Sequence, residues 1–253
     1  MDQPYPQSHA LDELSWVDVA AHLVRDARLL IPIGALEQHG PHLPLGANTL
    51  ISTRLADDLS AEFGVLRAPA MSYGVNFYGG TARVGRAWAG TATLRRKTLH
   101  RTVNELLAAW ESHGILEFIL ITAHRHEPHL DALATLVTRS ARVRVVSIWD
   151  VEIGDLLEGQ AGPMHAGEAE TSVMLHLYPH LVHMDRARDV HVTARSGAAR
   201  NDRLPLPPAD GNGIVGRATL ATTEKGTAIY RRILDAIRSA VFSAAAGAES
   251  DTL

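Results

Sequence analysis

The chain has 253 residues and a formal net charge of −4, from 24 Lys and Arg against 28 Asp and Glu. It contains no cysteine, which excludes disulfides, thiolate metal ligands and a cysteine nucleophile. The charges are interspersed, so no basic face predicts nucleic-acid binding and no polybasic run predicts a membrane anchor. Hydrophobic residues make up 46% of the chain, enough for a single buried core, and we expect one domain over 1–253.

The amino-terminal segment gives no sign of export. Residues 1–6 lack the basic and apolar regions of a signal peptide, and no apolar run approaches the length of a membrane span. We therefore expect a cytoplasmic protein. Residues 1–12 are polar and carry prolines, which predicts a loosely held arm.

The next elements alternate between helix and strand. Ser15 is expected to cap an amphipathic helix, and a buried strand follows at 29–33. A second helix is predicted to begin at Thr49 and to end near Gly64, before a short strand at 65–70.

The middle of the chain continues this alternation. Residues 71–90 are rich in glycine and aromatic residues without a clear period. A loop of this length is expected either to form part of a cleft wall or to be a surface excursion or subunit contact. The elements that follow are a helix from Thr93 to Gly114, a strand at 115–122 that is apolar on both faces, a helix at 130–141 and a strand at 143–149.

Alternation of strand and helix predicts a mostly parallel central sheet with helices on both faces, which is a three-layer α/β/α fold. Beyond the last strand, a helix is predicted to begin at Glu168, and residues 187–212 look irregular. The closing helix is predicted from about Thr223 to Ala245, after a capping sequence.

The stretch 31–48 places metal-capable side chains directly after a buried strand. Glu37, His39 and His42 follow the apolar run at once and stand between glycines and prolines. In an extended backbone, side chains two apart point the same way, so Glu37 and His39 should project together. A carboxylate oxygen and an imidazole nitrogen suit a zinc-like or ferrous ion. Two candidate ligands do not make a site, and the segment also fits a plain turn.

A second pair, His124 and His126, repeats the two-residue spacing just past the strand at 115–122. In a parallel sheet the carboxyl ends of the strands share one edge, where binding crevices form. Two ligand pairs that are distant in the sequence are therefore expected to meet at that edge. This convergence favours a metal site over two unrelated turns.

At these residues the sequence resembles the creatininase (creatinine amidohydrolase) family. The first similar motif, Glu37-Gln-His39-Gly-Pro-His42-Leu-Pro-Leu, is highly specific, and the resemblance covers nearly the whole chain. Among subgroups, the chain is similar to the creatininase-like peptidases of peptide-cofactor maturation at least as much as to creatininase proper. The other similar motifs are His165-Ala-Gly-x-x-Glu170-Thr-Ser, Gly90-Thr91 and Gly213-Ile-Val-Gly216.

The resemblance implies an α/β/α metal-dependent hydrolase of non-peptide or short-peptide C–N bonds, assembled as a hexamer with a two-metal site. By position, Glu37, His39 and His124 match metal ligands of the family. His165 matches a histidine that acts in proton transfer. The implied partners are a small-molecule or short-peptide substrate and further copies of this chain, with no nucleic acid and no membrane.

Two positions depart from the family pattern. Asn48 stands where the family has an aspartate that bridges both metals, and His126 stands where creatininase has a glutamate ligand and many relatives have glycine. Because an amide is neutral, two ions a few ångström apart would repel each other without the shared anion. We expect one divalent ion, zinc before iron or manganese, held by Glu37 or His39 together with His124 and His126.

Two further departures concern the substrate. The loop 122–127 has bulky side chains where the family has glycines, and the family's Glu-x-His segment has no match at 84–91. We therefore expect a substrate other than creatinine. Arg125 is expected to bind a substrate carboxylate or to pair with a neighbouring glutamate, and Trp88 and Trp149 are expected to line the pocket or to pack in the core.

The leading hypothesis is hydrolysis of an amide, cyclic amide or formamide-like bond. A divalent ion lowers the pKa of its water toward about 7 and polarises the carbonyl, while His165 passes a proton to the departing nitrogen. Glu170 is expected to orient His165, to lie near the metal, or simply to be stabilised at a helix N-terminus. Two rivals stay open: a degenerate member that serves as a binding or scaffold subunit, and a metal-dependent lyase or dehydratase in a biosynthetic pathway.

Overall fold

The computed structural model describes residues 8–76, 88–190 and 212–243. The chain divides into two compact units, and the prediction of a single domain stays a prediction. Among the described residues, no helix combines the length and the apolar composition that a bilayer crossing requires. The first unit consists of Met1–Glu37, Gly46–Ala82 and Ala87–Ser147, and the second of Gln38–Leu45, Arg83–Arg86 and Ile148–Leu253.

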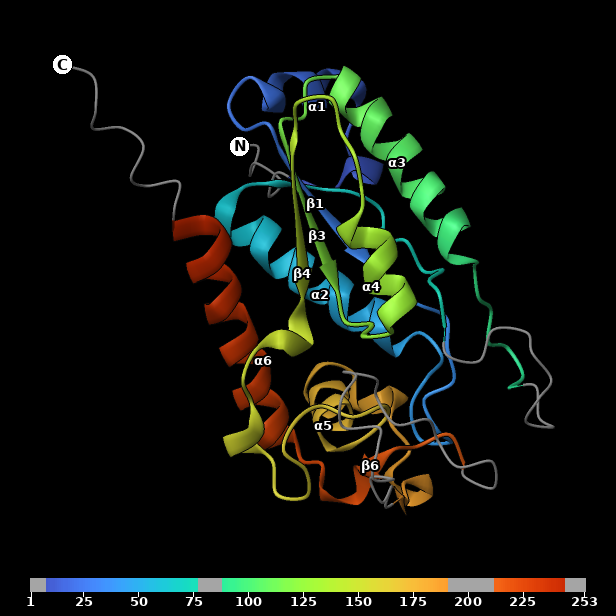
Figure 1. The fold of residues 1–253 in the computed structure, drawn as a ribbon. Coiled ribbons are helices and arrows are strands. Elements are labelled where there is room, and N and C mark those ends of the chain that lie inside the picture. The colour runs from blue at the N-terminus through green and yellow to red at the C-terminus, as the bar shows by residue number, and fades with distance from the viewer. Residues whose placement is uncertain (1–7, 77–87, 191–211, 244–253) are drawn as a thin grey trace. The chain divides into compact units, whose positions relative to one another are not determined.

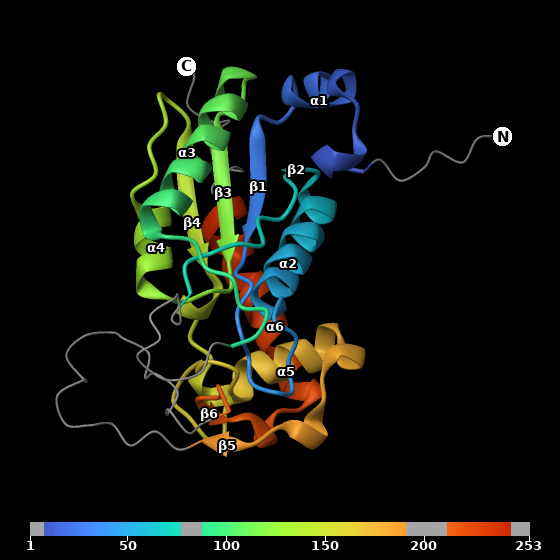
Figure 2. The same ribbon diagram turned by 90° about the vertical axis from the view of Figure 1, so that its right-hand side faces the viewer.

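The first unit is built on a parallel sheet (Figure 1), and its strand order β2-β1-β3-β4 can be followed in Figure 2. Every neighbouring pair in it is parallel, as the alternation of strands and helices predicted. From their second residues onward, β1 and β3 are buried, because both lie in the interior of the sheet. The strands are β1 (Arg28–Ile33), β2 (Leu66–Arg67), β3 (Glu117–Thr122) and β4 (Arg142–Ser147).

Helices cover both faces of this sheet, so the unit has three layers (Figure 2). One face packs against α2 (Ala47–Phe63), and the other carries α3 (Arg96–Ser112) and α4 (Glu127–Ala134). Because successive strand residues point to opposite faces, alternate residues of β1 and β3 join the α3 and α4 side of the core. That cluster includes Leu29, Ile31, Phe118, Leu120, Leu99 and Leu107. The predicted three-layer α/β/α fold is confirmed.

The described part of the segment before β1 contains a capped helix. Ser15 caps α1 (Trp16–Leu23) as predicted, because its side chain accepts a hydrogen bond from the Asp18 backbone N–H. Within the predicted arm at 1–12, residues 1–7 lie outside the described part of the chain. Ala10 is buried and forms a bridge with Arg67.

The predicted helix at 130–141 is wrong at both ends, since α4 runs over Glu127–Ala134. It begins early because Pro128 fits the first turn of a helix and Glu127 adds a favourable negative charge there. Past its end, the Glu111 carboxylate accepts from three backbone N–H groups at 2.7 to 2.9 Å, and these N–H groups lower its pKa to about 2. The three groups belong to Arg139, Ser140 and Ala141.

In the second unit, α5 (Glu168–Leu177) packs closely against α6 (Thr223–Ile237). A Cβ atom at Gly226 would lie 1.9 Å from the Ser172 carbonyl oxygen, so this approach requires glycine. Thr222 caps α6 as predicted. A short antiparallel pair, β5 (Asp189–Val190) with β6 (Gly216–Arg217), completes the unit. The segment predicted to be irregular falls largely at 191–211, outside the described residues, as do the last positions of the predicted closing helix.

Candidate functional site

In the first unit, the predicted ligands stand at one edge of the sheet. Glu37 follows β1 and His124 follows β3, and the register pairs Ile33 with Thr122 at the carboxyl ends of these strands. Both loops therefore leave the sheet at the same level, as expected for neighbouring parallel strands. Asn48 joins them from the first turn of α2.

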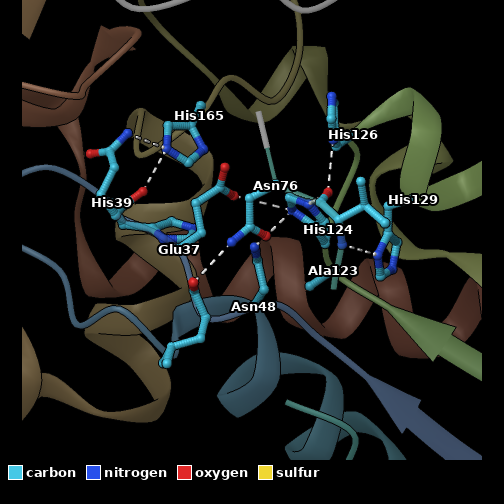
Figure 3. A network of polar contacts seen from close by, with 12 residues as sticks. Glu37, His39, Asn48, Asn76, Ala123, His124, His126, His129 and His165 are labelled. Carbon is cyan, nitrogen blue, oxygen red and sulfur yellow. Dashed lines mark hydrogen bonds and ion pairs between the residues drawn. The ribbon is translucent and has the colours of Figure 1, made fainter. Parts of the chain in front are cut away.

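His124 has a defined set of contacts within this unit (Figure 3). Its Nε2 lies 2.8 Å from the Val75 carbonyl oxygen, and because a carbonyl only accepts, Nε2 must carry the hydrogen. Its Nδ1 then keeps a lone pair, which accepts from Asn48 Nδ2 at 3.0 Å. The same Nδ1 lies 3.3 Å from Glu37 Oε2. Since Glu37, Asn48 and His124 are all buried, the Nδ1 atom and the carboxylate oxygen lie close together away from bulk water.

That arrangement fits a cation. A carboxylate oxygen and an imidazole nitrogen are both common metal ligands, and His124 Nδ1 becomes available to a cation when the Asn48 amide hydrogen gives way. Metal binding requires a deprotonated carboxylate and a neutral imidazole, and the tautomer of His124 already meets this requirement. The donor set in this unit therefore matches the chemistry that a divalent ion demands.

His126 and the residues predicted to contact substrate also belong to the first unit. Nδ1 of His126 lies 2.7 Å from the same Val75 oxygen, and the ring centroids of His126 and His124 are 6.0 Å apart. Burial lowers the pKa of His126, while its contact with Val75 opposes that shift. Arg125 and Trp88 are both partly exposed.

Sequence reasoning missed His129. It is fully buried, its ring centroid lies 4.8 Å from that of His124, and its Nδ1 accepts a hydrogen bond from the Val75 backbone N–H at 3.3 Å. Burial, followed by the nearby charge of His126, lowers its pKa to about 3. The available signal was its position, three residues after His126 and on the first turns of α4.

Asn76 was also missed, and it fixes the loop that carries Glu37. Its side-chain amide donates to the carbonyl oxygens of Leu36 and Ala92, at 2.9 and 2.8 Å. Its backbone N–H donates to Thr93 Oγ1, which explains why Thr93 precedes α3 and does not begin it. Within the first unit, Asn76 thus joins the segments that precede Glu37 and α3.

The second unit gathers His39, His165 and Glu170. The ring centroids of His39 and His165 are 4.6 Å apart, and their ligand nitrogens lie within 4.8 Å of each other. Nε2 of His39 lies 3.8 Å from Glu170 Oε2. Burial raises the pKa of Glu170 to about 8. Burial, followed by the charge of His39, holds the pKa of His165 well below its ordinary value.

Gln38 offers His165 both a hydrogen-bond acceptor and a hydrogen-bond donor. The Nε2 atom of His165 lies 2.8 Å from the Gln38 carbonyl oxygen and 3.0 Å from the Gln38 side-chain nitrogen. The amide of Gln38 is itself fixed, because it accepts from the Gly40 N–H and donates to the Gly213 carbonyl. His165 Nε2 therefore has an acceptor when it carries a proton and a donor when it does not.

Two further features surround these groups in the second unit. His42 Nε2 lies 2.9 Å from Thr171 Oγ1, and burial together with the charge of His39 lowers the pKa of His42 to about 4. Ala166 has φ of 52°, a left-handed conformation that costs a non-glycine residue about 1 kcal/mol or more. Its N–H donates to Glu170 Oε2 at 2.7 Å. Trp149 is only 3% exposed, as packing in the core requires.

The family model for creatininase, described as creatinine amidohydrolase, matches residues 12–241. The chain belongs to the creatininase family. It is 29% identical to the creatinine amidohydrolase of Pseudomonas putida, over 90% of this chain and 94% of that protein. It is 30% identical to the mycofactocin precursor peptide peptidase of Mycobacterium ulcerans (strain Agy99), over 82% of this chain and 81% of that protein.

Solved creatininases share the fold. A crystal structure of creatinine amidohydrolase has a TM-score of 0.76 at 27% identity, covering 92% of this chain and 98% of that one. A creatininase mutant described as the Zn-Zn type matches equally well, with a TM-score of 0.76 at 28% identity over the same shares. These likenesses confirm the predicted family and a creatininase-like fold.

Within this creatininase-family chain, each unit brings a subset of the predicted residues together. Glu37, Asn48 and His124 meet in the first unit, and His39, His165 and Glu170 meet in the second. Of the segment 84–91, predicted to lack the family's Glu-x-His element, the first half, 84–87, lies outside the described residues. Glu37, His39 and His165 are all buried, and each side chain offers one atom that can bind a metal ion.

Proposed function

We propose that this chain is a metal-dependent hydrolase of a C–N bond in an amide, a cyclic amide or a short peptide, with a substrate other than creatinine. The observation that carries this proposal is the buried Glu37 oxygen that lies 3.3 Å from His124 Nδ1. Family membership supports it, since the relatives compared are named as an amidohydrolase and a peptidase.

In the proposed centre, Glu37 and His124 of the first unit hold one divalent ion, and zinc is the first candidate. His39 stays a predicted ligand because of its two-residue step from Glu37 along the chain. The predicted ligand His126 donates to the same Val75 oxygen as His124, so its bare nitrogen points away from His124 Nδ1. Asn48 donates its amide hydrogen to His124, so it adds no negative charge to offset a second dication. A single ion per chain is therefore proposed.

Protein groups supply the proton transfer. When bound, a divalent ion lowers the pKa of water and polarises a substrate carbonyl. His165 is proposed to take a proton from the attacking water and then to hand it to the departing nitrogen, because burial keeps its imidazole neutral and so able to accept that proton. Gln38 satisfies His165 Nε2 both with and without its hydrogen. Glu170, whose pKa is raised to about 8, is proposed to orient the Ala166 backbone beside His165.

The proposed reaction defines the class of substrate, a compound with a C–N bond that can be hydrolysed. The names of the relatives do not identify the compound itself. Two relatives of nearly equal identity carry names for different substrates. Arg125, Trp88 and Trp149 are proposed to contact the substrate, although the burial of Trp149 gives it a packing role as well. Homo-oligomeric assembly, a biosynthetic role and a cytoplasmic location stay predictions.

The decisive experiment combines metal analysis with turnover. The full chain, purified without chelator, should contain about one zinc equivalent, and its hydrolysis of a panel of lactams, cyclic ureides, formamides and short peptides should stop on chelation and return with Zn²⁺. Reaction in H₂¹⁸O should place one ¹⁸O in the product. Turnover without ¹⁸O would favour the lyase alternative, and two fully occupied ions would contradict the single-ion proposal.

One observation favours the second candidate, a degenerate member without hydrolysis. The Asn48 amide hydrogen occupies the very lone pair of His124 that a metal would need. If this bond outcompetes metal, the purified chain should contain no divalent ion and should bind none in calorimetric titrations with Zn²⁺, Mn²⁺ or Fe²⁺. Any of these ions bound at micromolar affinity would exclude that candidate.

A further inference from the structure

In the first unit, the backbone of Val75 forms hydrogen bonds with the imidazole nitrogens of three histidines, which Figure 3 labels. Its carbonyl oxygen lies 2.8 Å from His124 Nε2 and 2.7 Å from His126 Nδ1. Its N–H donates to His129 Nδ1 at 3.3 Å. A carbonyl has two lone pairs and an amide has one hydrogen, so these contacts use the full hydrogen-bonding capacity of Val75.

These bonds dictate where each imidazole keeps its hydrogen. The shared carbonyl requires a hydrogen on His124 Nε2 and on His126 Nδ1, because an oxygen acceptor cannot serve a bare nitrogen. The Val75 N–H requires a bare Nδ1 on His129, whose hydrogen is then on Nε2, 3.3 Å from Thr122 Oγ1. For His124 the same result follows independently, since Asn48 donates to its Nδ1.

We propose that Val75 is the positioning residue of the metal ligand His124: it forces His124 to present Nδ1 as the nitrogen that binds metal, and it gives His126 the opposite tautomer. A metal-ligating histidine is usually fixed by the partner of its second nitrogen, often a backbone carbonyl. Here a single carbonyl fixes two rings of opposite tautomer. His129 holds the other side of that peptide in place.

Gly74 is the residue through which this arrangement can be disturbed. A Cβ atom there would lie 2.7 Å from the Gly34 carbonyl oxygen and 2.8 Å from His129 Nδ1. Neither a backbone oxygen nor a buried ring can move away freely, so Gly74→Ala should displace the Val75 peptide. Gly162→Ala is a matched control, because a Cβ atom at Gly162 meets nothing within 4 Å.

The first test needs no variant and no metal. Long-range ¹H–¹⁵N correlation spectra of the full, chelated chain report which nitrogen of each neutral imidazole carries hydrogen, and the fourteen histidines can be assigned by single substitutions. We expect His124 and His129 with hydrogen on Nε2 and His126 with hydrogen on Nδ1. Hydrogen on Nδ1 of His124, or rapid exchange between its two tautomers, would overturn the proposal.

The second test measures metal affinity, and this arm alone rests on the proposed function. Competition with a chromophoric chelator should show that Gly74→Ala weakens Zn²⁺ binding by about 10- to 100-fold, the usual effect of losing an outer partner of a ligand, and that it mixes the His124 tautomers. Gly162→Ala should change neither property. A folded Gly74→Ala variant with wild-type affinity and wild-type tautomers would refute the role of Val75.

The outcomes separate this proposal from the proposed function. If the tautomers are as expected but no amide is hydrolysed, the hydrolase assignment fails and the positioning role stands. If hydrolysis is found but His124 carries hydrogen on Nδ1, the positioning role fails and the hydrolase stands. Should Gly74→Ala fail to fold by circular dichroism, the wild-type spectra decide alone.

Discussion

The histidines of the two units are held in different ways. In the first unit, His124 and His126 bind a backbone carbonyl, which fixes the position of each ring hydrogen. In the second unit, burial, followed by the charge of His39, lowers the pKa of both His42 and His165. One arrangement therefore sets the tautomer of a ring and the other sets its charge. The first suits a residue that must present a lone pair, and the second suits a residue that must exchange a proton.

The largest expected effect would come from removing the proposed metal ligand His124, whose ring hydrogen is fixed by a backbone carbonyl. His124→Ala should lower Zn²⁺ affinity by more than about 100-fold, beyond the loss expected for an outer partner, and should abolish turnover. Isothermal titration with Zn²⁺ measures the first effect. His180→Ala removes an exposed histidine and should leave the affinity unchanged. Turnover retained by His124→Ala would remove the proposed mechanism.

Adding charge beside His124 should have the next largest effect. Asn48→Asp replaces the amide that donates to Nδ1 with a carboxylate that can bind two ions, so metal content should rise from about one to about two equivalents. Inductively coupled plasma mass spectrometry gives the count. Asn104→Asp, which keeps the acceptor for the Val137 N–H, should leave it at one. A second ion already present in the wild type would contradict the expectation.

The protonation of Glu170 in the second unit should be visible in the pH dependence of the free energy of unfolding. The pKa of Glu170 is about 8 in the folded chain against 4.5 when unfolded, so the folded state binds the extra proton between these values. The free energy of unfolding of the metal-free chain should therefore fall as pH rises through this window, by up to about 1.4 kcal/mol per pH unit.

Glu170→Gln should remove this slope. The window from pH 6.5 to 8 is the most informative, because the opposite trend from His42, whose pKa falls from 6.5 to about 4, ends below it. Urea unfolding of chelated protein measures the slope, and Glu152→Gln, an exposed site, is the control. Identical slopes for wild type and Glu170→Gln would show that Glu170 is ionised in the folded chain.

The smallest expected effect concerns Glu111, on α3 of the first unit. The pKa of Glu111 is lowered to about 2 from 4.5, so its stabilisation should be complete above pH 4.5 and should be lost as pH falls toward 2. Glu111→Gln should therefore lower the thermal midpoint slightly at pH 7 and by less at pH 3. Glu105→Gln, exposed on the same helix, should show no such difference.

Local sequence signals predicted two helix caps and the two central strands of the sheet. Ser15 and Thr222 cap helices where their hydroxyls predicted it, and the apolar runs before Glu37 and His124 are the two strands that place these side chains. Those signals succeed because capping and burial depend on neighbours in the sequence. The spacing of Glu37 and His39 likewise predicted a metal-capable loop.

What the sequence did not reveal depends on partners distant along the chain. Glu111 holds the backbone that follows α4 from another helix, and Val75 fixes His124 through a backbone atom whose action does not depend on the identity of its side chain. Asn48 was recognised as a substitution, but its bond to His124 Nδ1 required the fold. Backbone acceptors leave no residue type to recognise, so these contacts could not be predicted.

The pairing of Ile33 with Thr122 limits how this chain can change during evolution. Inserting or deleting one residue in either strand would turn every later side chain of that strand through half a turn, from one face of the sheet to the other. Glu37 or His124 would then leave the loop edge pointing away from its counterpart. Length is therefore constrained in the strands more tightly than composition, and tolerated variation in length should accumulate in the connecting segments instead.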